Sequence, residues 1–207
     1  MATSNVSTFL QTIGQGVKPN MFLVDIKFPT DLGGASQALG TDLTNILCKS
    51  AALPGSNLGV IEVPFRGRTV KIAGDRTFDT WSATFFNDKN MEIRGLFEEW
   101  ANLLNTHEAN TAERFLPNGG DTGYMASLYV TQLEKDDQEG GSAIRTYELH
   151  HCFPTNISQI DLAYDSNDQI EEFTVEWQYS YFTASKSNSG TSASASVKGT
   201  ASDKPVV

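Results

Sequence analysis

Residues 63–100 constrain the fold most strongly, because they place three kinds of element in direct succession. The pattern predicts a β-hairpin that turns at Arg66 and Gly67, then a strand at residues 78–86, then a helix at residues 90–105. Apolar residues alternate with polar ones in the strand, and recur every three or four residues in the helix. No residue in this segment belongs to a nucleophile, metal-ligand or phosphate-binding motif. A scaffold of this kind favours a protein that works by shape and self-association.

The rest of the chain repeats the alternating pattern, giving roughly seven to nine strands in all. Because the strands alternate rather than run continuously apolar, we expect antiparallel sheets with one buried face. The fold class is therefore mainly β: an antiparallel β-sandwich or partial barrel with one flanking α-helix, begun by Asn87 or Asp88 as a cap. The predicted strands are residues 21–28, 43–53, 58–65, 68–73, 78–86, 124–133, 143–153, 157–164 and 169–182.

The chain has 207 residues, which favours one domain. Residues 1–19 are predicted to be an extended N-terminal arm that docks through Phe9, Leu10 and Ile13. Residues 20–183 form the β domain. Residues 184–207 are a serine-rich, low-complexity tail, expected to be mobile unless a neighbouring chain holds it.

Net charge, the length of the apolar runs and the cysteine spacing each limit the classes of function. With 25 acidic and 15 basic residues the formal net charge is −10, so a basic footprint for nucleic acid is not expected. No apolar run approaches the roughly 20 residues of a membrane span, and the first residues do not resemble a signal peptide. Cys48 and Cys152 lie in no paired motif, which fits a reducing compartment and leaves a single disulfide open.

Two patterns contain residues that can bind metal, but neither makes a convincing site. His150 and Cys152 can share one face of a strand, but two ligands make a poor site. Asp165 begins a stretch similar to a calcium loop, yet Ile170 stands where glycine is required, so a hairpin turn is favoured. The acidic run at residues 134–139 is predicted to be a solvated loop tip. We predict no catalytic, cofactor or metal-binding residues, and no enzyme.

Several of these segments resemble one family. They are GDRTF at residues 74–78 leading to Trp81, FFND at 85–88, FEEW at 97–100, LPG at 53–55, and YDSNDQIEEFTVEWQY at 164–179. Together, over about residues 18–182, they resemble the T4-like contractile-phage tail tube protein family, whose fold also serves type VI secretion and other injection machines. The serine-rich tail departs from that pattern.

The resemblance implies homohexameric rings, with inner strands from six subunits closing a continuous β-barrel and rings stacking into a tube. It implies a tail sheath outside, baseplate and tail-terminator proteins at the ends, and DNA that passes the lumen without specific binding or cofactor. Such a protein would belong to the virion after assembly in the host cytoplasm. An acidic lumen would repel phosphate, which agrees with the net charge.

Candidate inter-subunit contacts follow from this reading. The glycine-rich loop at residues 31–42, with Gly33, Gly34 and Gly40, is expected to contact a stacked ring. Three arginines cluster in a chain with few cations and are expected to pair with acids across an interface, although internal or solvent-exposed ion pairs remain an equal alternative. They are Arg66, Arg68 and Arg76.

Three alternatives stay open at this point. A baseplate tube-initiator ring and the tube of an injection system would share the same strands. A ligand-binding β-barrel is an alternative of a different class, in which the aromatic strand at residues 173–182 lines a pocket. The barrel predicts a monomer with an apolar cavity, whereas the tube predicts rings and filaments.

Overall fold

The computed structural model describes residues 5–14, 16–29, 32, 34–107, 123–134 and 142–186. Gly33, most of the acidic tip at residues 134–141, and the tail beyond Lys186 therefore lie outside the described residues. The elements are α1 (Val6–Ile13), β1 (Phe22–Ile26), α2 (Gly34–Leu47), β2 (Cys48–Ala51), β3 (Asn57–Phe65), β4 (Arg68–Thr77), β5 (Trp81–Phe86), α3 (Glu92–Leu104), β6 (Ala126–Glu134), β7 (Ser142–Ile157), β8 (Glu172–Gln178) and β9 (Tyr181–Lys186).

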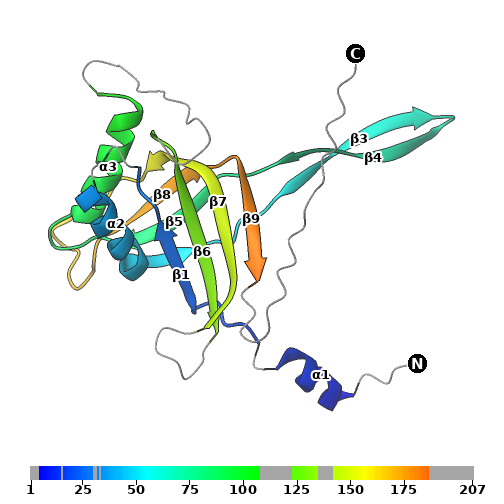
Figure 1. The fold of residues 1–207 in the computed structure, drawn as a ribbon, viewed down its shortest axis with the longest axis horizontal. Coiled ribbons are helices and arrows are strands. Elements are labelled where there is room, and N and C mark those ends of the chain that lie inside the picture. Colours follow the sequence, from blue (N-terminus) through cyan, green and yellow to red (C-terminus); the bar gives the residue numbers. More distant parts are fainter. Residues whose placement is uncertain are drawn as a thin grey trace.

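The main sheet has seven strands in the order β1-β6-β7-β8-β5-β2, and β9 also pairs with β7. Every pairing is antiparallel. Strand β7, with 16 residues, joins two parts of this sheet: its first part pairs with β6 and β9, and its end pairs with β8. Figure 1 shows the sheet curving around α2 and α3 without closing on itself. The predicted mainly β, antiparallel fold is confirmed.

The core lies where β5 pairs with β8. Trp81 lies opposite Trp177, and Phe85 lies opposite Phe173, and all four side chains are at most 3% exposed. The alternation predicted for these strands is therefore confirmed. Phe97 of α3 packs on this face, with its ring centroid 5.4 Å from that of Phe85.

Helix α3 matches its prediction closely: it spans Glu92–Leu104, Met91 is in the N-cap position, and the Asp88 side chain bonds to its first turn as expected. The Asp88 carboxylate accepts hydrogen bonds from the backbone N–H groups of Ile93 (3.2 Å) and Asn90 (3.0 Å). Burial acts to raise the pKa of Asp88, but these and neighbouring backbone N–H groups outweigh it and hold the pKa below its usual value. The carboxylate thus stabilises the start of the helix that covers the core.

Helix α2 corrects two predictions. Residues 31–42 were expected to be a loop and residues 43–53 a strand, but Gly34–Leu47 is helical and only Cys48–Ala51 is a strand. Tertiary contacts outweigh the low helix propensity of its glycines. Gly40 is buried where a Cβ atom would lie 2.5 Å from Cε2 of Phe28, and the hydroxyl of Thr41 donates to the carbonyl of Ile26 at 3.0 Å.

Two further predictions about secondary structure were wrong. Residues 6–13 form a helix rather than an extended arm, because Val6, Phe9 and Ile13 share a helical face and Gly14 ends it with φ +57°. Residues 158–171 form a loop rather than a strand at 157–164.

The predicted strand at residues 169–182 is β8 and β9, interrupted at Tyr179 and Ser180. The register of β9 along β7 continues into the end of β8 and then shifts between Pro154 and Asn156. The break lies opposite Cys152 and His151, and the His151 φ of +57° disturbs the ladder there. Tyr179 is buried on the core side of this break, whereas Tyr181 is 43% exposed beyond it.

Both cysteines are free thiols. Burial raises the pKa of Cys48 to about 12, only partly offset by a contact with the Ser50 backbone, so this thiol is a packing residue rather than a reactive one. None of the described helices has the length and apolarity to cross a membrane.

Candidate assembly surfaces

Strands β3 and β4 form an arm that stands apart from the main sheet. They pair only with each other, and Figure 1 shows the arm projecting along the long axis of the molecule to its tip. The turn confirms the predicted hairpin: Arg66 has φ +45° and Gly67 has φ +79°. Two left-handed residues are typical of the type I′ turn that matches the twist of paired strands.

One face of the arm is apolar and uncovered. Ile61 lies opposite Ile72, and Val63 opposite Val70, so their side chains share a face with Phe65. These side chains, which we call the arm face, are 42–61% exposed: Ile61, Val63, Phe65, Val70 and Ile72. A two-stranded hairpin with solvent on both faces is marginally stable at best. A contiguous exposed apolar patch marks an interaction surface.

The three arginines that were predicted to contact a neighbouring subunit all lie on this arm and are exposed. Arg66 and Arg68 flank Gly67 at the tip, and Arg76 lies near the base, opposite Leu58. The guanidinium of Arg66 lies 5.4 Å from the ring centroid of Phe65. Among the described residues none of the three forms an ion pair within 4 Å.

The glycines that were predicted to contact a stacked ring do not lie in one site with the arginines. Gly34 begins α2, and Gly40 is buried in that helix against Phe28 and Leu96 of the same chain. Gly40 thus has a packing role within the subunit, and an inter-subunit role for Gly33 and Gly34 stays a prediction.

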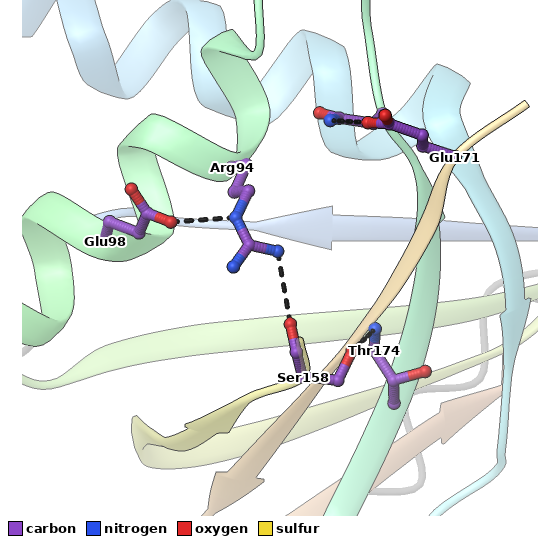
Figure 2. A network of polar contacts seen from close by, with 6 residues as sticks. Arg94, Glu98, Ser158, Glu171 and Thr174 are labelled. Atoms are coloured by element: carbon purple, nitrogen blue, oxygen red, sulfur yellow. Dashed lines mark hydrogen bonds and ion pairs between the residues drawn. The ribbon is translucent and has the colours of Figure 1, made fainter. Parts of the chain in front are cut away.

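A second exposed feature is the loop at residues 158–171, whose ends are fixed to the body of the domain. Figure 2 shows Arg94 of α3 donating to the Ser158 carbonyl (3.2 Å) and to the Glu98 carboxylate (2.8 Å). The Ser158 hydroxyl accepts a hydrogen bond from the Thr174 backbone N–H (2.8 Å). At the other end Asn87 donates to Glu171 (3.0 Å). Sequence reasoning missed this network; the only signal was the spacing of Arg94 and Glu98 on one helix face.

Between its fixed ends the loop encloses an open groove of about 610 Å³, lined by both apolar and acidic side chains. Leu162 and Ile170 line it while remaining 80% and 68% exposed. Residues 158–172 carry five carboxylates and no cationic side chain. The predicted tight hairpin turn at residues 165–168 is wrong: the turn lies inside the long loop, where the Ser166 N–H donates to the Ala163 carbonyl (3.3 Å), and Asp168 has φ +60°. The described residues hold no cluster of three or more metal-binding side chains.

The third feature is the sheet β1-β6-β7-β9, which has one polar face. The register aligns Asp25, Tyr129, Glu148 and Thr183 across the four strands. The Tyr129 hydroxyl donates to the Glu148 carboxylate at 2.8 Å. Within the described residues β1 and β9 each pair on one side only, so this sheet has two open edges.

His150 and His151 belong to the same region and have structural contacts. His150 stacks on Tyr181 at 4.6 Å between ring centroids and lies 3.2 Å from the Thr183 hydroxyl. Cys152 is fully buried in the core.

In the part of the chain that the structure describes, the β domain has two open sheet edges and an arm that pairs with no other strand. These features define a class of protein that completes its structure by assembly. A family model described as phage tail tube protein matches residues 17–185, and the chain belongs to this family. It is 30% identical to tail tube protein gp19 of Enterobacteria phage T4 over 169 residues, covering 82% of this chain and 92% of that protein. It is 28% identical to the tail tube protein of Serratia phage KSP90 over 180 residues, covering 86% and 95% respectively.

Solved structures share the fold. One is a chain of the PVC sheath–tube complex of an extracellular contractile injection system in its extended state, with TM-score 0.55 and 13% identity, covering 89% of this chain and 100% of that one. Another is a chain of the sheath/tube terminator of the same system, with TM-score 0.56 and 13% identity, covering 82% and 96%. The family model and the curated relatives are those of tail tube proteins, a structural family, as predicted.

Proposed function

We propose that this chain forms the inner tube of a contractile phage tail, as homohexameric rings stacked into a conduit for DNA. The observation that carries the proposal is the sheet β1-β6-β7-β9, which has two open edges and a polar face in a member of the tail tube family. Joining β9 of one subunit to β1 of the next would continue the antiparallel sheet around a ring. Closure of this kind removes the edges.

The polar face suits a lumen through which DNA slides. Asp25 and Glu148 place two carboxylates on this face in each subunit, and Lys27 lies 3.0 Å from Asp25. The chain as a whole has a formal net charge of −10. An acidic surface repels phosphates, so the nucleic acid would pass without specific binding.

Partners follow from the same assignment. A tail sheath would surround the tube, and baseplate and tail-terminator proteins would cover its ends; similar folds occur in the PVC sheath–tube and terminator structures. The protein would be part of the virion or of a phage-like particle and would assemble in the host cytoplasm. A baseplate initiator ring or an injection-system tube remains the alternative, and one similar fold lies in the anti-feeding prophage baseplate (TM-score 0.52, 15% identity).

The ligand-binding barrel is not supported by the aromatic strand that suggested it. Phe173 and Trp177 of β8 are buried in the core, and the ring centroid of Trp177 lies 5.7 Å from that of Phe97. These side chains fill the interior instead of lining a cavity.

The test is negative-stain electron microscopy of the purified chain over a range of concentrations, with sedimentation velocity on the same samples. Rings or hollow tubes are the expected result. If the chain remains a monomer at every concentration, the next sample adds a candidate baseplate initiator. A monomer that persists with the initiator present would contradict the proposal.

A further inference from the structure

We propose that the arm tip of one copy docks in the groove of the 158–171 loop of a second copy of this chain. The arm tip is defined here as residues 65–68. This inference rests on the proposed self-assembly and names the partner surface for the arm. It is drawn from charge, from exposed apolar side chains, and from the placement of the two features in the fold.

The charges of the two features are complementary. Residues 57–77 of the arm carry four cationic side chains and two carboxylates, against an acidic whole chain. The loop carries only carboxylates. Arg66 and Arg68 form no ion pair within the described residues. Opposite charges of this kind steer association and set its register.

Three carboxylates of the loop are available to pair with the arginines of the arm tip. Glu171 accepts a hydrogen bond from Asn87, and Glu172 lies 2.6 Å from Lys49. In the described part of the chain, Asp161, Asp165 and Asp168 form no ion pair and are exposed. Asp161 lines the groove itself and accepts a hydrogen bond only from the Gln159 amide (3.3 Å) among the described contacts, so a guanidinium entering there would meet a carboxylate that forms no ion pair.

The apolar surfaces also match in kind. Phe65, at the tip, is 61% exposed, and Leu162 and Ile170 in the groove are more exposed still. The groove of about 610 Å³ falls within the roughly 300–1,000 Å³ of sites that bury a compact ligand. One aromatic ring beside two guanidinium groups is a suitable occupant, because apolar contact and charge pairing are then made together.

The positions of the two features require separate copies. In Figure 1 the arm tip lies at one end of the long axis, whereas the loop lies at the other end beside the helices. Arg94 of α3 holds one end of the loop, and Asn87, which follows β5, holds the other. A tip on one end and a receptor on the other make a head-to-tail contact. Contacts of this type generate closed rings or extended stacks.

The experiment uses charge reversal in the full chain. A tip variant, R66E/R68E, and a groove variant, D161R/D165R, are each expected to lower the fraction of protein in rings or tubes by at least tenfold at a concentration where the wild-type chain assembles. Mixing the two variants in equal amounts should restore assembly, because the tip of each variant then meets side chains of opposite charge at positions 161 and 165 of the other. One chain carrying all four reversals should assemble alone.

A control is K89E/E99R, which reverses two exposed charges outside both the arm and the 158–171 loop and should assemble as the wild type does. Far-ultraviolet circular dichroism establishes that each variant is folded. Wild-type tubes together with normal assembly of either the tip or the groove variant would overturn the docking alone. The docking would also be overturned if the folded variants assemble neither when mixed nor when all four reversals are combined in one chain. A wild-type chain that never assembles, even with an initiator, overturns the proposed function and the docking together.

Discussion

Two antiparallel strand pairs in this molecule have the same alternating pattern and opposite surroundings. In the β5–β8 pair, Phe85 and Phe173 are at most 1% exposed, because Phe97 and the rest of α3 cover them. In the β3–β4 pair, every side chain of the arm face is at least 42% exposed. Alternation therefore indicates a strand with one apolar face, but not whether the same chain provides the cover for that face.

The difference separates two sources of free energy. Burial of the β5–β8 face stabilises the single subunit. The arm face is free to contribute on association instead, at roughly 25 cal/mol per Å² of apolar surface removed from water. Substitutions in the two pairs should therefore affect different equilibria.

The largest expected effect comes from Phe97→Ala. Removing this ring leaves a cavity between α3 and the β5–β8 pair, so we expect the free energy of unfolding to fall by about 3–5 kcal/mol. Urea denaturation of the monomer, followed by tryptophan fluorescence, measures it.

Phe65→Ala on the arm is the matched control for Phe97→Ala. Its free energy of unfolding should change by no more than about 0.5 kcal/mol, while the protein concentration needed for assembly should rise. Equal losses of monomer stability for the two variants would show that the arm is covered within its own subunit and would break the comparison.

The second largest effect is expected in helix α2, where the sequence had predicted a loop. Gly40→Ala would place a Cβ atom 2.5 Å from Cε2 of Phe28, and that ring is held between Phe97 and Trp100. Overpacking of about 1–3 kcal/mol should exceed the helix-propensity gain of up to about 1 kcal/mol. The melting temperature in calorimetry should therefore fall.

Gly95→Ala provides the opposite outcome in the neighbouring helix α3. A Cβ atom at Gly95 would meet nothing within 4 Å, so this substitution should raise stability by roughly 0.5–1 kcal/mol. A rise in melting temperature for both variants would mean that Gly40 is not closely packed, and that α2 does not cover the body as described.

The third prediction concerns the start of α3, the helix that covers the body but not the arm. Asp88→Ala should lower stability by about 1 kcal/mol near neutral pH, as loss of a cap does. Because the folded-state pKa of Asp88 is lowered, its contribution is present above the unfolded-state pKa and is lost as the pH falls through the folded-state value. Denaturation at several pH values should show the two proteins converging in acid.

Asp75→Ala on the exposed arm serves as the control for Asp88→Ala. It removes one carboxylate as well, but should change stability by only a few tenths of a kcal/mol at any of these pH values. A difference between wild type and Asp88→Ala that persists below the folded-state pKa would contradict the role of the carboxylate.

The sequence predicted those parts of the fold in which local pattern and tertiary cover agree. Helix α3 and the apolar faces of β5 and β8 were predicted correctly because the spacing of their apolar residues matches the faces that are buried in the folded protein. Helix α2 was missed because its stability depends on the contact of Gly40 with Phe28, which no local pattern records. The three arm arginines were singled out because cations are few in this acidic chain, and their role at an interface stays a prediction. The 158–171 groove was not recognised, because its shape depends on Arg94 and Asn87 holding its two ends.

The smallest expected effect comes from two exposed ion pairs that join neighbouring segments. Glu62 and Lys71 lie 3.6 Å apart on the arm, and Lys49 and Glu172 lie 2.6 Å apart on the body. Exposed pairs contribute only about 0.2–1 kcal/mol. Double-mutant cycles to alanine in the monomer should give the body pair a coupling energy in that range and the arm pair a coupling energy near the lower limit.

Repeating both cycles on assembled protein sharpens the comparison between the two regions. Loss of solvent around the arm would strengthen its pair, since charges interact more strongly where water is excluded. The body pair, whose Glu172 lines the groove, should change only if a neighbouring subunit occupies that groove. A coupling energy for Glu62 and Lys71 that is unchanged by assembly would mean that the charged face of the arm stays in water, and that only the arm face and the tip are covered by a neighbouring subunit.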